Sequence, residues 1–408
     1  MSLRPKYLSS ILLAGFLLSV SFFPRSAAAG PVVTDPLNRD PQVREAFDRF
    51  YIMDYKGSIS RFETIRSQHP NNPIATAYLL YANLFSELFR LDLLDTTFYA
   101  NDGFLTGKHT VVEDPQMRDH IKQLTDNAVD EADRELKENP NDVNALFARG
   151  WAKSLDAVYL AMVERSFGAA LKLASQAHSD HARVLQLNPD YVDAKLVTGD
   201  YEYVVGALSL PFKILVGFAG IHGSKATGME MLRDAGSRGV ITSVEARTCM
   251  MLFLRREAKY QEAEQTAEGL VREYPRDFLF RLEVANLQKD AGQGLKAISS
   301  YREVIELSRK PDYFPSSHLE LVYFGLGDTL RGQKLYADAV EAFDSAAYQP
   351  ATSPELKRRS LLAAGQVYDL MHDHDKARQQ YQAVIDAGSD TVQADQARKF
   401  IRAAYTGR

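Results

Sequence analysis

The sequence predicts an all-α protein, a right-handed solenoid of helix hairpins with an irregular middle section. Apolar residues recur at i, i+3, i+4 and i+7 through much of the chain, for example over 118–138 and 241–255. No segment alternates polar and apolar residues between turn signals, as a strand would. Small residues recur at intervals typical of helical repeats, and the interval from Ala263 to Ala297 is 34 residues. We therefore expect about 17 helices.

The predicted organisation has four parts. Residues 1–29 form a signal peptide, 30–190 divergent N-terminal hairpins, 191–240 an irregular hydrophobic section, and 241–408 a hairpin array that ends in a capping helix. The second part carries an insert at 93–115 that lacks helical periodicity. Loops of this length inside a compact domain are usually functional or mobile, so the insert is a candidate site.

Residues 1–29 have the pattern of a secretory signal peptide. Arg4 and Lys6 precede an apolar run over 11–20, and small residues lead to Ala29, after which we place cleavage. An uncleaved anchor helix is the alternative, although the run is short for a membrane span of about 20 residues. We therefore expect the mature protein to be periplasmic or secreted.

The composition excludes several classes of protein. With 45% hydrophobic and 25% charged residues, the chain is neither wholly disordered nor fibrous. The formal charge of −5 leaves no basic field for a nucleic-acid backbone, so no nucleic-acid partner is expected. The lone Cys249 excludes an internal disulfide and a thiolate metal site, so stability must come from packing.

Each predicted hairpin carries a small residue where its two helices approach most closely. Most of these are followed four positions later by an apolar, usually aromatic, residue. The small positions are Ser58, Ala128, Ala177, Ala263, Ala297, Ala339 and Ala377. Prolines stand 12 residues after four of them, just past the expected end of a second helix, because proline cannot continue a helix. These prolines are Pro70, Pro140, Pro189 and Pro275.

These positions resemble the tetratricopeptide repeat family in a divergent form. The units over 276–388 fit its pattern best, although no tryptophan opens a repeat and the middle spacings are stretched. The fitting residues are Tyr323, Leu326, Gly327, Leu330, Ala339, Phe343, Ala346, Leu361, Ala364, Gly365, Tyr368, Ala377, Tyr381 and Val384. In such hairpins we expect Gly327 to face Ala339 and Ala346. Likewise, Gly365 is expected to face Ala377.

In tetratricopeptide geometry the first helix of each pair lines a concave face. The resemblance therefore implies a groove for a protein segment, since arginine suits planar carboxylates and can clamp an extended peptide. The groove residues are expected to be Arg255, Arg256, Asn286, Lys289, Asp328, Arg331, Arg359, Gln366 and Asp369. The family's carboxylate clamp is not reproduced, because Gly325 stands where one asparagine belongs. The alternative is an ordinary solvated charged face.

The run 203–221 is apolar except for Lys213 and has Pro211 inside it. A lysine and a proline at mid-span disfavour a membrane helix, so we expect a helix pair buried between repeats. The alternative is an envelope protein that contacts membrane or lipid through this run. The middle region also faintly resembles eukaryotic divergent tetratricopeptide proteins, some of which associate with lipid droplets or outer organelle membranes.

The sequence contains no recognisable catalytic constellation, metal site or cofactor motif. His178 and His181 share a predicted helix, and His372 lies near His374 in a turn, but two ligands do not make a metal site. We expect both pairs to lie on a solvated surface. The predicted function is therefore an exported, non-enzymatic scaffold that binds a protein or peptide. An enzyme or solute-binding protein with its site in 93–115 is the second alternative.

Overall fold

The structure is a computed structural model that describes residues 32–99, 112–208 and 222–407. These residues form 17 α-helices and three short 3-10 helices, and no strand occurs among them. The prediction of an all-α chain is therefore confirmed. The signal-peptide prediction and most of the 203–221 run fall outside the described residues. No helix in the described ranges is both long enough and apolar enough to span a bilayer.

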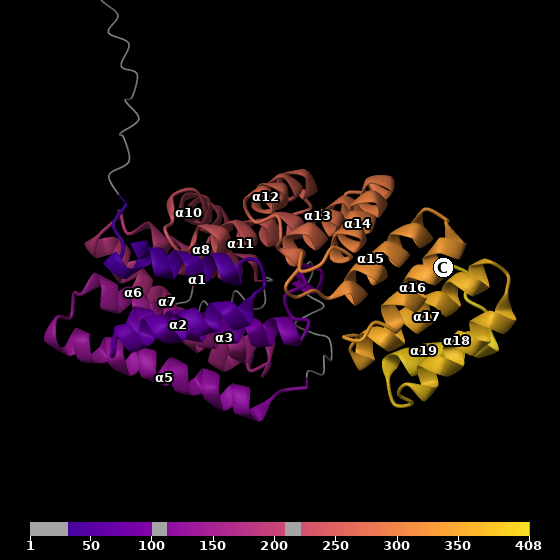
Figure 1. Cartoon of the computed structure of the whole chain (residues 1–408), viewed down its shortest axis with the longest axis horizontal. Coiled ribbons are helices and arrows are strands. Elements are labelled where there is room, and N and C mark those ends of the chain that lie inside the picture. The colour runs from indigo at the N-terminus through magenta and orange to yellow at the C-terminus, as the bar shows by residue number, and fades with distance from the viewer. Residues whose placement is uncertain (1–31, 100–111, 209–221, 408) are drawn as a thin grey trace, which may run out of the picture. The chain divides into compact units, whose positions relative to one another are not determined.

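The N-terminal half of the described chain is a series of helices that each pack on a sequence neighbour (Figure 1). The helices are α1 (Pro41–Phe50), α2 (Tyr55–Gln68), α3 (Pro73–Arg90), α5 (Pro115–Glu138), α6 (Val143–Met162), α7 (Phe167–Leu187) and α8 (Lys195–Ala207). The 3-10 helices are η1 (Pro36–Arg39), η2 (Thr96–Tyr99) and η3 (Val192–Ala194). Because α3 packs on both α5 and α6, and α6 packs on α7, these helices share one core, whereas α8 contributes Leu196 and Tyr203 to a second core with α10 and α11.

The C-terminal half continues the same arrangement with shorter helices (Figure 1). They are α10 (Lys225–Arg238), α11 (Ser243–Arg256), α12 (Tyr260–Glu273), α13 (Phe278–Asp290), α14 (Gly294–Ser308), α15 (Leu319–Gly332), α16 (Tyr336–Ala347), α17 (Pro354–Leu370), α18 (His374–Asp386) and α19 (Val392–Arg402). Each packs on the next. In addition α13 contacts α15, and α15 contacts α17. The first helices of successive hairpins therefore lie side by side and form one face.

Helix ends follow the local sequence. The carboxylate of Asp54 caps α2 by accepting from the backbone N–H of Gly57 at 3.0 Å, and Asp277 caps α13 by accepting from Phe280 at 2.8 Å. All four predicted prolines stand two residues beyond the last residue of α2, α5, α7 or α12. Proline thus marks the end of the second helix, as predicted.

The small positions predicted from the repeat pattern are all completely buried. The glycines differ in detail from the prediction. A Cβ on Gly327 would lie 2.8 Å from the Phe343 ring, and one on Gly365 would lie 2.5 Å from the Tyr381 ring. The closest neighbour of each glycine is therefore an aromatic ring and not one of the expected alanines. The aromatic ring four residues after each alanine fills the space instead.

Candidate binding face and adjoining cavity

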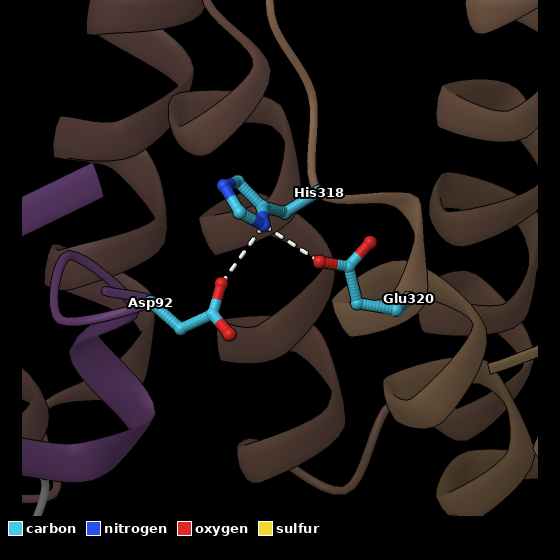
Figure 2. Close-up of side chains that lie close together, drawn as sticks. All are labelled: Asp92, His318 and Glu320. Atoms are coloured by element: carbon cyan, nitrogen blue, oxygen red, sulfur yellow. Dashed lines mark hydrogen bonds and ion pairs between the residues drawn. The ribbon is translucent and has the colours of Figure 1, made fainter. Parts of the chain in front are cut away.

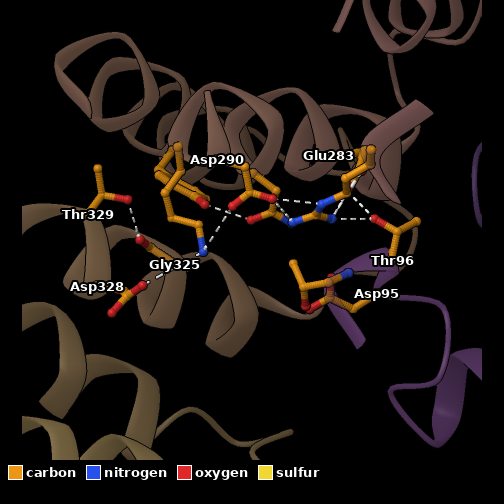
Figure 3. Close-up of polar contacts among 12 residues, drawn as sticks. Asp95, Thr96, Glu283, Asp290, Gly325, Asp328 and Thr329 are labelled. Atoms are coloured by element: carbon orange, nitrogen blue, oxygen red, sulfur yellow. Dashed lines mark hydrogen bonds and ion pairs between the residues drawn. The ribbon is translucent and has the colours of Figure 1, made fainter. Parts of the chain in front are cut away.

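A row of polar side chains runs along the face made by α11, α13, α15 and α17, and Figure 3 shows the part of it from Thr96 to Asp328. We call it the polar row. Each member forms a hydrogen bond or an ion pair with at least one other member, so the row links four successive first helices to the start of the 93–115 insert. Its members are Thr96, Arg255, Glu283, Asp290, Lys289, Asp328, Arg331 and Gln366.

Arg255 is the buried end of the polar row. Its side chain is 2% exposed, and two of its nitrogens donate to Asp290 Oδ2 at 2.7 and 2.5 Å. Its third nitrogen donates to Thr96 Oγ1 at 2.7 Å and lies 3.3 Å from both oxygens of Glu283. Burial raises the pKa of Glu283 to about 7, although the charge of Arg255 opposes this shift. This guanidinium therefore holds α11, α13 and η2 together.

The other end of the polar row is more accessible. The ammonium of Lys289 lies 3.8 Å from Asp328, and Arg331 donates to Asp328 at 2.5 Å and to Gln366 Oε1 at 3.1 Å. The side chains of Lys289 and Arg331 are 24% and 30% exposed. Arg359 is on α17, the helix that also carries Gln366, and its guanidinium lies 4.7 Å from the centre of the Phe324 ring.

The remaining predicted groove residues have internal partners. Asn286 is buried and accepts a hydrogen bond from the Tyr301 hydroxyl at 2.6 Å. Asp369 is buried and accepts from Tyr381. Arg256 donates to the backbone carbonyl of Tyr99 at 2.7 Å. The structure thus brings five of the nine predicted residues onto one row, and a binding role for them stays a prediction.

Gly325 shows why the family's carboxylate clamp is missing. A Cβ at this position of α15 would lie 2.7 Å from the Tyr301 hydroxyl oxygen. Because that hydroxyl is fixed by Asn286, no side chain fits at position 325 beside it.

A cavity of about 160 Å³ adjoins the polar row. Its wall is mainly aromatic and aliphatic and is contributed by α1, α2, α3, α11, α13 and the segment before η2. The aromatic lining residues are Phe50, Tyr51, Tyr55, Tyr81, Phe85 and Phe280. Three residues of the polar-row neighbourhood, Thr96, Glu283 and Asn286, also line it. The cavity and the row therefore meet on α13.

Glu245 is the acid at the base of this cavity. One of its oxygens accepts hydrogen bonds from the hydroxyls of both Tyr51 and Tyr81. Its second oxygen is buried and has no hydrogen-bond partner among the described residues. Burial raises the pKa of Glu245, and the two tyrosine hydrogen bonds act in the opposite direction.

The expectation that His178 and His181 lie on a solvated surface is wrong for His181, while the His178 side chain is 24% exposed. His181 is fully buried, with its ring nitrogens 3.1 Å from the Phe147 carbonyl and 3.3 Å from the Ala194 carbonyl. Burial lowers the pKa of His181 to about 4. The reason is tertiary, because α7 packs against both α6 and α8. The one sequence feature that fits the burial of His181 is Gly150, because a Cβ at that position would lie 2.2 Å from the His181 ring.

One cluster was missed by the sequence reasoning. Asp92, His318 and Glu320 meet between the turn after α3 and the start of α15 (Figure 2). His318 and Glu320 are two positions apart, and this spacing alone resembles no ligand motif. Asp92 is 226 positions away, so no local pattern announces the cluster.

Comparison with known proteins identifies no relative by sequence. No protein-family model and no curated protein matches the chain. Among solved structures, human IFIT1 with m7Gppp-AAAA is 12% identical over 89% of this chain and 86% of its own, with a TM-score of 0.43. Yeast Tom70 is 13% identical over 89% and 88%, with a TM-score of 0.41. A tetratricopeptide repeat protein from Parabacteroides merdae is 16% identical over 78% and 97%, with a TM-score of 0.33.

At such low similarity, the fold is argued from the chain's own helices. Successive antiparallel helices pack in sequence order, the small positions are buried, and prolines follow the second helices. The described chain is accordingly a divergent, tetratricopeptide-like stack of helix pairs.

Proposed function

We propose that this protein is an exported scaffold that binds an extended protein segment along the face of α13, α15 and α17. The polar row is the observation that carries the proposal. Its accessible end presents Lys289 on α13 and Arg331 on α15, and Arg359 lies on the neighbouring first helix, α17. An extended segment laid across these helices would meet one cation on each helix. Its carboxylates would replace Asp328 as the ion-pair partner of Lys289 and Arg331. Helical repeats commonly use such surfaces for binding.

A triple alanine variant tests this face. Peptides selected on the wild-type protein from a random display library should bind Lys289→Ala/Arg331→Ala/Arg359→Ala about tenfold more weakly or worse, as three partly exposed charge contacts predict. The measurement is fluorescence anisotropy of the labelled peptide.

The matched control removes three cations from the second helices and their ends. Arg302, Arg309 and Lys376 are each more than half exposed and each pairs with one carboxylate. Their triple alanine variant should bind like the wild type. Equal affinity of the wild type and the α13–α15–α17 variant would overturn the proposal.

Export is part of the proposal and rests on the leader pattern of residues 1–29. A reporter that is active only outside the cytoplasm, fused after this leader, should be active in a bacterial host. Leu17→Arg in the apolar run should abolish that activity, because a charge there disrupts signal-peptide insertion. N-terminal sequencing of the exported protein should begin at Gly30, and a retained leader would contradict the assigned cleavage.

The cavity favours a second candidate function, binding of one apolar ring-sized group. A cavity of about 150 Å³ in another protein admits benzene, and this one is of similar size at about 160 Å³. Leu94, Asp95 and Thr96 line it, so the start of the 93–115 insert contributes to the site. The ligand would be a free small molecule or a side chain of the bound segment.

Calorimetry with benzene and indole tests the second candidate. Thr248 lines the cavity and donates to the carbonyl four residues earlier at 3.0 Å. Thr248→Leu should fill the space and abolish binding. Thr266→Leu is the control, since Thr266 makes the same type of bond on α12 outside the cavity. Binding that survives Thr248→Leu would place the ligand elsewhere.

One alternative and one expectation stay predictions. Lipid contact through 203–221 is tested by liposome flotation of the mature protein with and without Leu215→Asp. A lack of flotation would remove that alternative. The absence of catalysis also stays a prediction.

A further inference from the structure

Two carboxylates and one imidazole converge in a buried position beside α15 (Figure 2). His318 Nδ1 lies 2.8 Å from Asp92 Oδ1 and 2.6 Å from Glu320 Oε1. The side chains of Asp92, His318 and Glu320 are only 13%, 11% and 1% exposed. One ligand atom from each residue lies within 4.8 Å of the other two.

The charges of this cluster do not balance. Within the described ranges, neither carboxylate has a lysine or arginine partner, and both share the single Nδ1–H of His318. One N–H satisfies only one acceptor well, and Asp92 Oδ1 is indeed buried without a hydrogen bond to any residue that the structure describes. Even a protonated His318 leaves one negative charge uncompensated. Leaving such a charge buried is costly, so the cluster calls for a further cation.

A second histidine in the same chain shows what a balanced pair looks like. His374 Nδ1 lies 2.6 Å from Oδ1 of the buried Asp369. The other oxygen of Asp369 accepts from the Tyr381 hydroxyl at 2.7 Å and from the Tyr405 backbone N–H at 2.8 Å. One imidazole meets one carboxylate, and every acceptor has a donor. No cation is required there.

We infer that Asp92, His318 and Glu320 bind one divalent transition-metal ion through Nδ1 and one oxygen of each carboxylate. A neutral imidazole and two carboxylates neutralise a charge of +2. One nitrogen and two oxygens suit Zn²⁺ or Mn²⁺, whereas Ca²⁺ takes six to eight oxygen ligands. With bonds of about 2.0–2.2 Å to Zn²⁺, the ligand atoms need to move apart only slightly.

The surrounding fold holds the three ligands in place. The Phe89 ring packs edge-on against His318, with centroids 4.3 Å apart and an interplanar angle of 77°. Glu320 lies in the first turn of α15, and Asp92 lies in the turn after α3 with a positive φ of 57°. Three protein ligands leave a coordination position for water or another group. A bound ion would join the N-terminal helices to the C-terminal array.

The test uses mature full-length protein stripped of metal with a chelator. Titration with ZnCl₂, and separately MnCl₂, against a chromogenic competing chelator should show one ion bound per chain, and Zn²⁺ should raise the melting temperature by linkage. Glu320→Gln and His318→Gln should each weaken Zn²⁺ binding about a hundredfold or more, because each removes a direct ligand. His374→Gln, the matched control, should bind Zn²⁺ like the wild type.

A second readout separates a metal site from a simple ion triad. Glu320→Gln removes the uncompensated charge, so it should melt at a higher temperature than metal-free wild type while losing the Zn²⁺-induced rise. A structural ion triad predicts the opposite, a lower melting temperature and no stoichiometric Zn²⁺ binding in any form. That result, or an equal loss of affinity in His374→Gln, would overturn the inference.

Discussion

Three polar side chains, on α7 and α11, differ in how their hydrogen-bonding groups are satisfied. His181 and Arg255 are buried and Glu245 is partly buried, and each has a distinct hydrogen-bonding environment. The ring of His181 lies between two backbone carbonyls, of which its single N–H can serve one. Arg255 donates to three side chains, and one oxygen of Glu245 has no hydrogen-bond partner in the described part of the chain. The sequence suggests none of these roles, because each depends on partners from other helices.

The buried neutral His181 predicts a specific dependence of stability on pH. Its pKa falls from 6.5 to about 4 on folding, so the unfolded chain binds more protons between these values. The stability that neutral His181 provides is complete above pH 6.5 and is lost as the pH falls towards 4. The full shift corresponds to about 3 kcal/mol.

His181→Gln is expected to flatten this dependence. Melting temperatures of the wild type and the variant, measured between pH 4.5 and 7.5, should differ less at the acid end than at the neutral end. His372→Gln, at an exposed turn position, should change neither the melting temperature nor its slope with pH. A variant that kept the wild-type slope would show that His181 is not the group responsible.

At the scale of helices and hairpins, the sequence was a good guide. Helical periodicity, small positions and prolines predicted the hairpins because these signals act through neighbouring residues. The same signals failed on the partner of each hairpin glycine, where an aromatic ring stands instead of an alanine. The periodicity identifies a buried face, but the rotamers of the opposite helix decide which side chain fills it.

Gly365 offers a test of this close packing. A Cβ there would overlap the Tyr381 ring, which is fully buried and fixed by Asp369. Gly365→Ala should therefore destabilise the fold by about 1–3 kcal/mol, despite the better helix propensity of alanine.

Gly332 on α15 has no atom within 4 Å of an added Cβ and serves as the control. Gly332→Ala should be neutral or slightly stabilising. Urea unfolding followed by circular dichroism measures both variants. Equal stability of the two would mean that the ring of Tyr381 moves freely, contrary to its burial.

For the whole molecule, contacts between distant segments could not be anticipated. Thr96 meets Glu283 and Arg255, and Asp92 meets His318, across more than 150 positions of sequence. The hairpin pattern predicts which neighbouring helices pair, but it does not predict which turns from distant parts of the chain come into contact. The sequence therefore predicted which helix face carries the candidate site. The cavity, the buried contact of Arg255 with Glu283 and the cluster around His318 could be found only in the three-dimensional structure.

The last helix, α19, is expected to protect the end of the stack. It packs on α17 and α18, and Phe400 contacts the Tyr381 ring at 5.5 Å between centroids. Ending the chain after Gly388 would uncover Tyr381 and Val384, so the melting temperature should fall by several degrees and a hydrophobic dye should bind. Val392→Asp, at a position 67% exposed, is the control and should show neither change. An unaltered truncated protein would mean that α18 already closes the stack.

The pairing of Gly325 with Tyr301 has a consequence for protein engineering. The Tyr301 phenol fills the space that a side chain at position 325 would need, and its hydroxyl donates a hydrogen bond to the Asn286 amide oxygen. Grafting an asparagine onto α15 alone would collide with that ring. Building a carboxylate clamp into this protein would therefore require two substitutions at once, a smaller residue at position 301 and an asparagine at position 325.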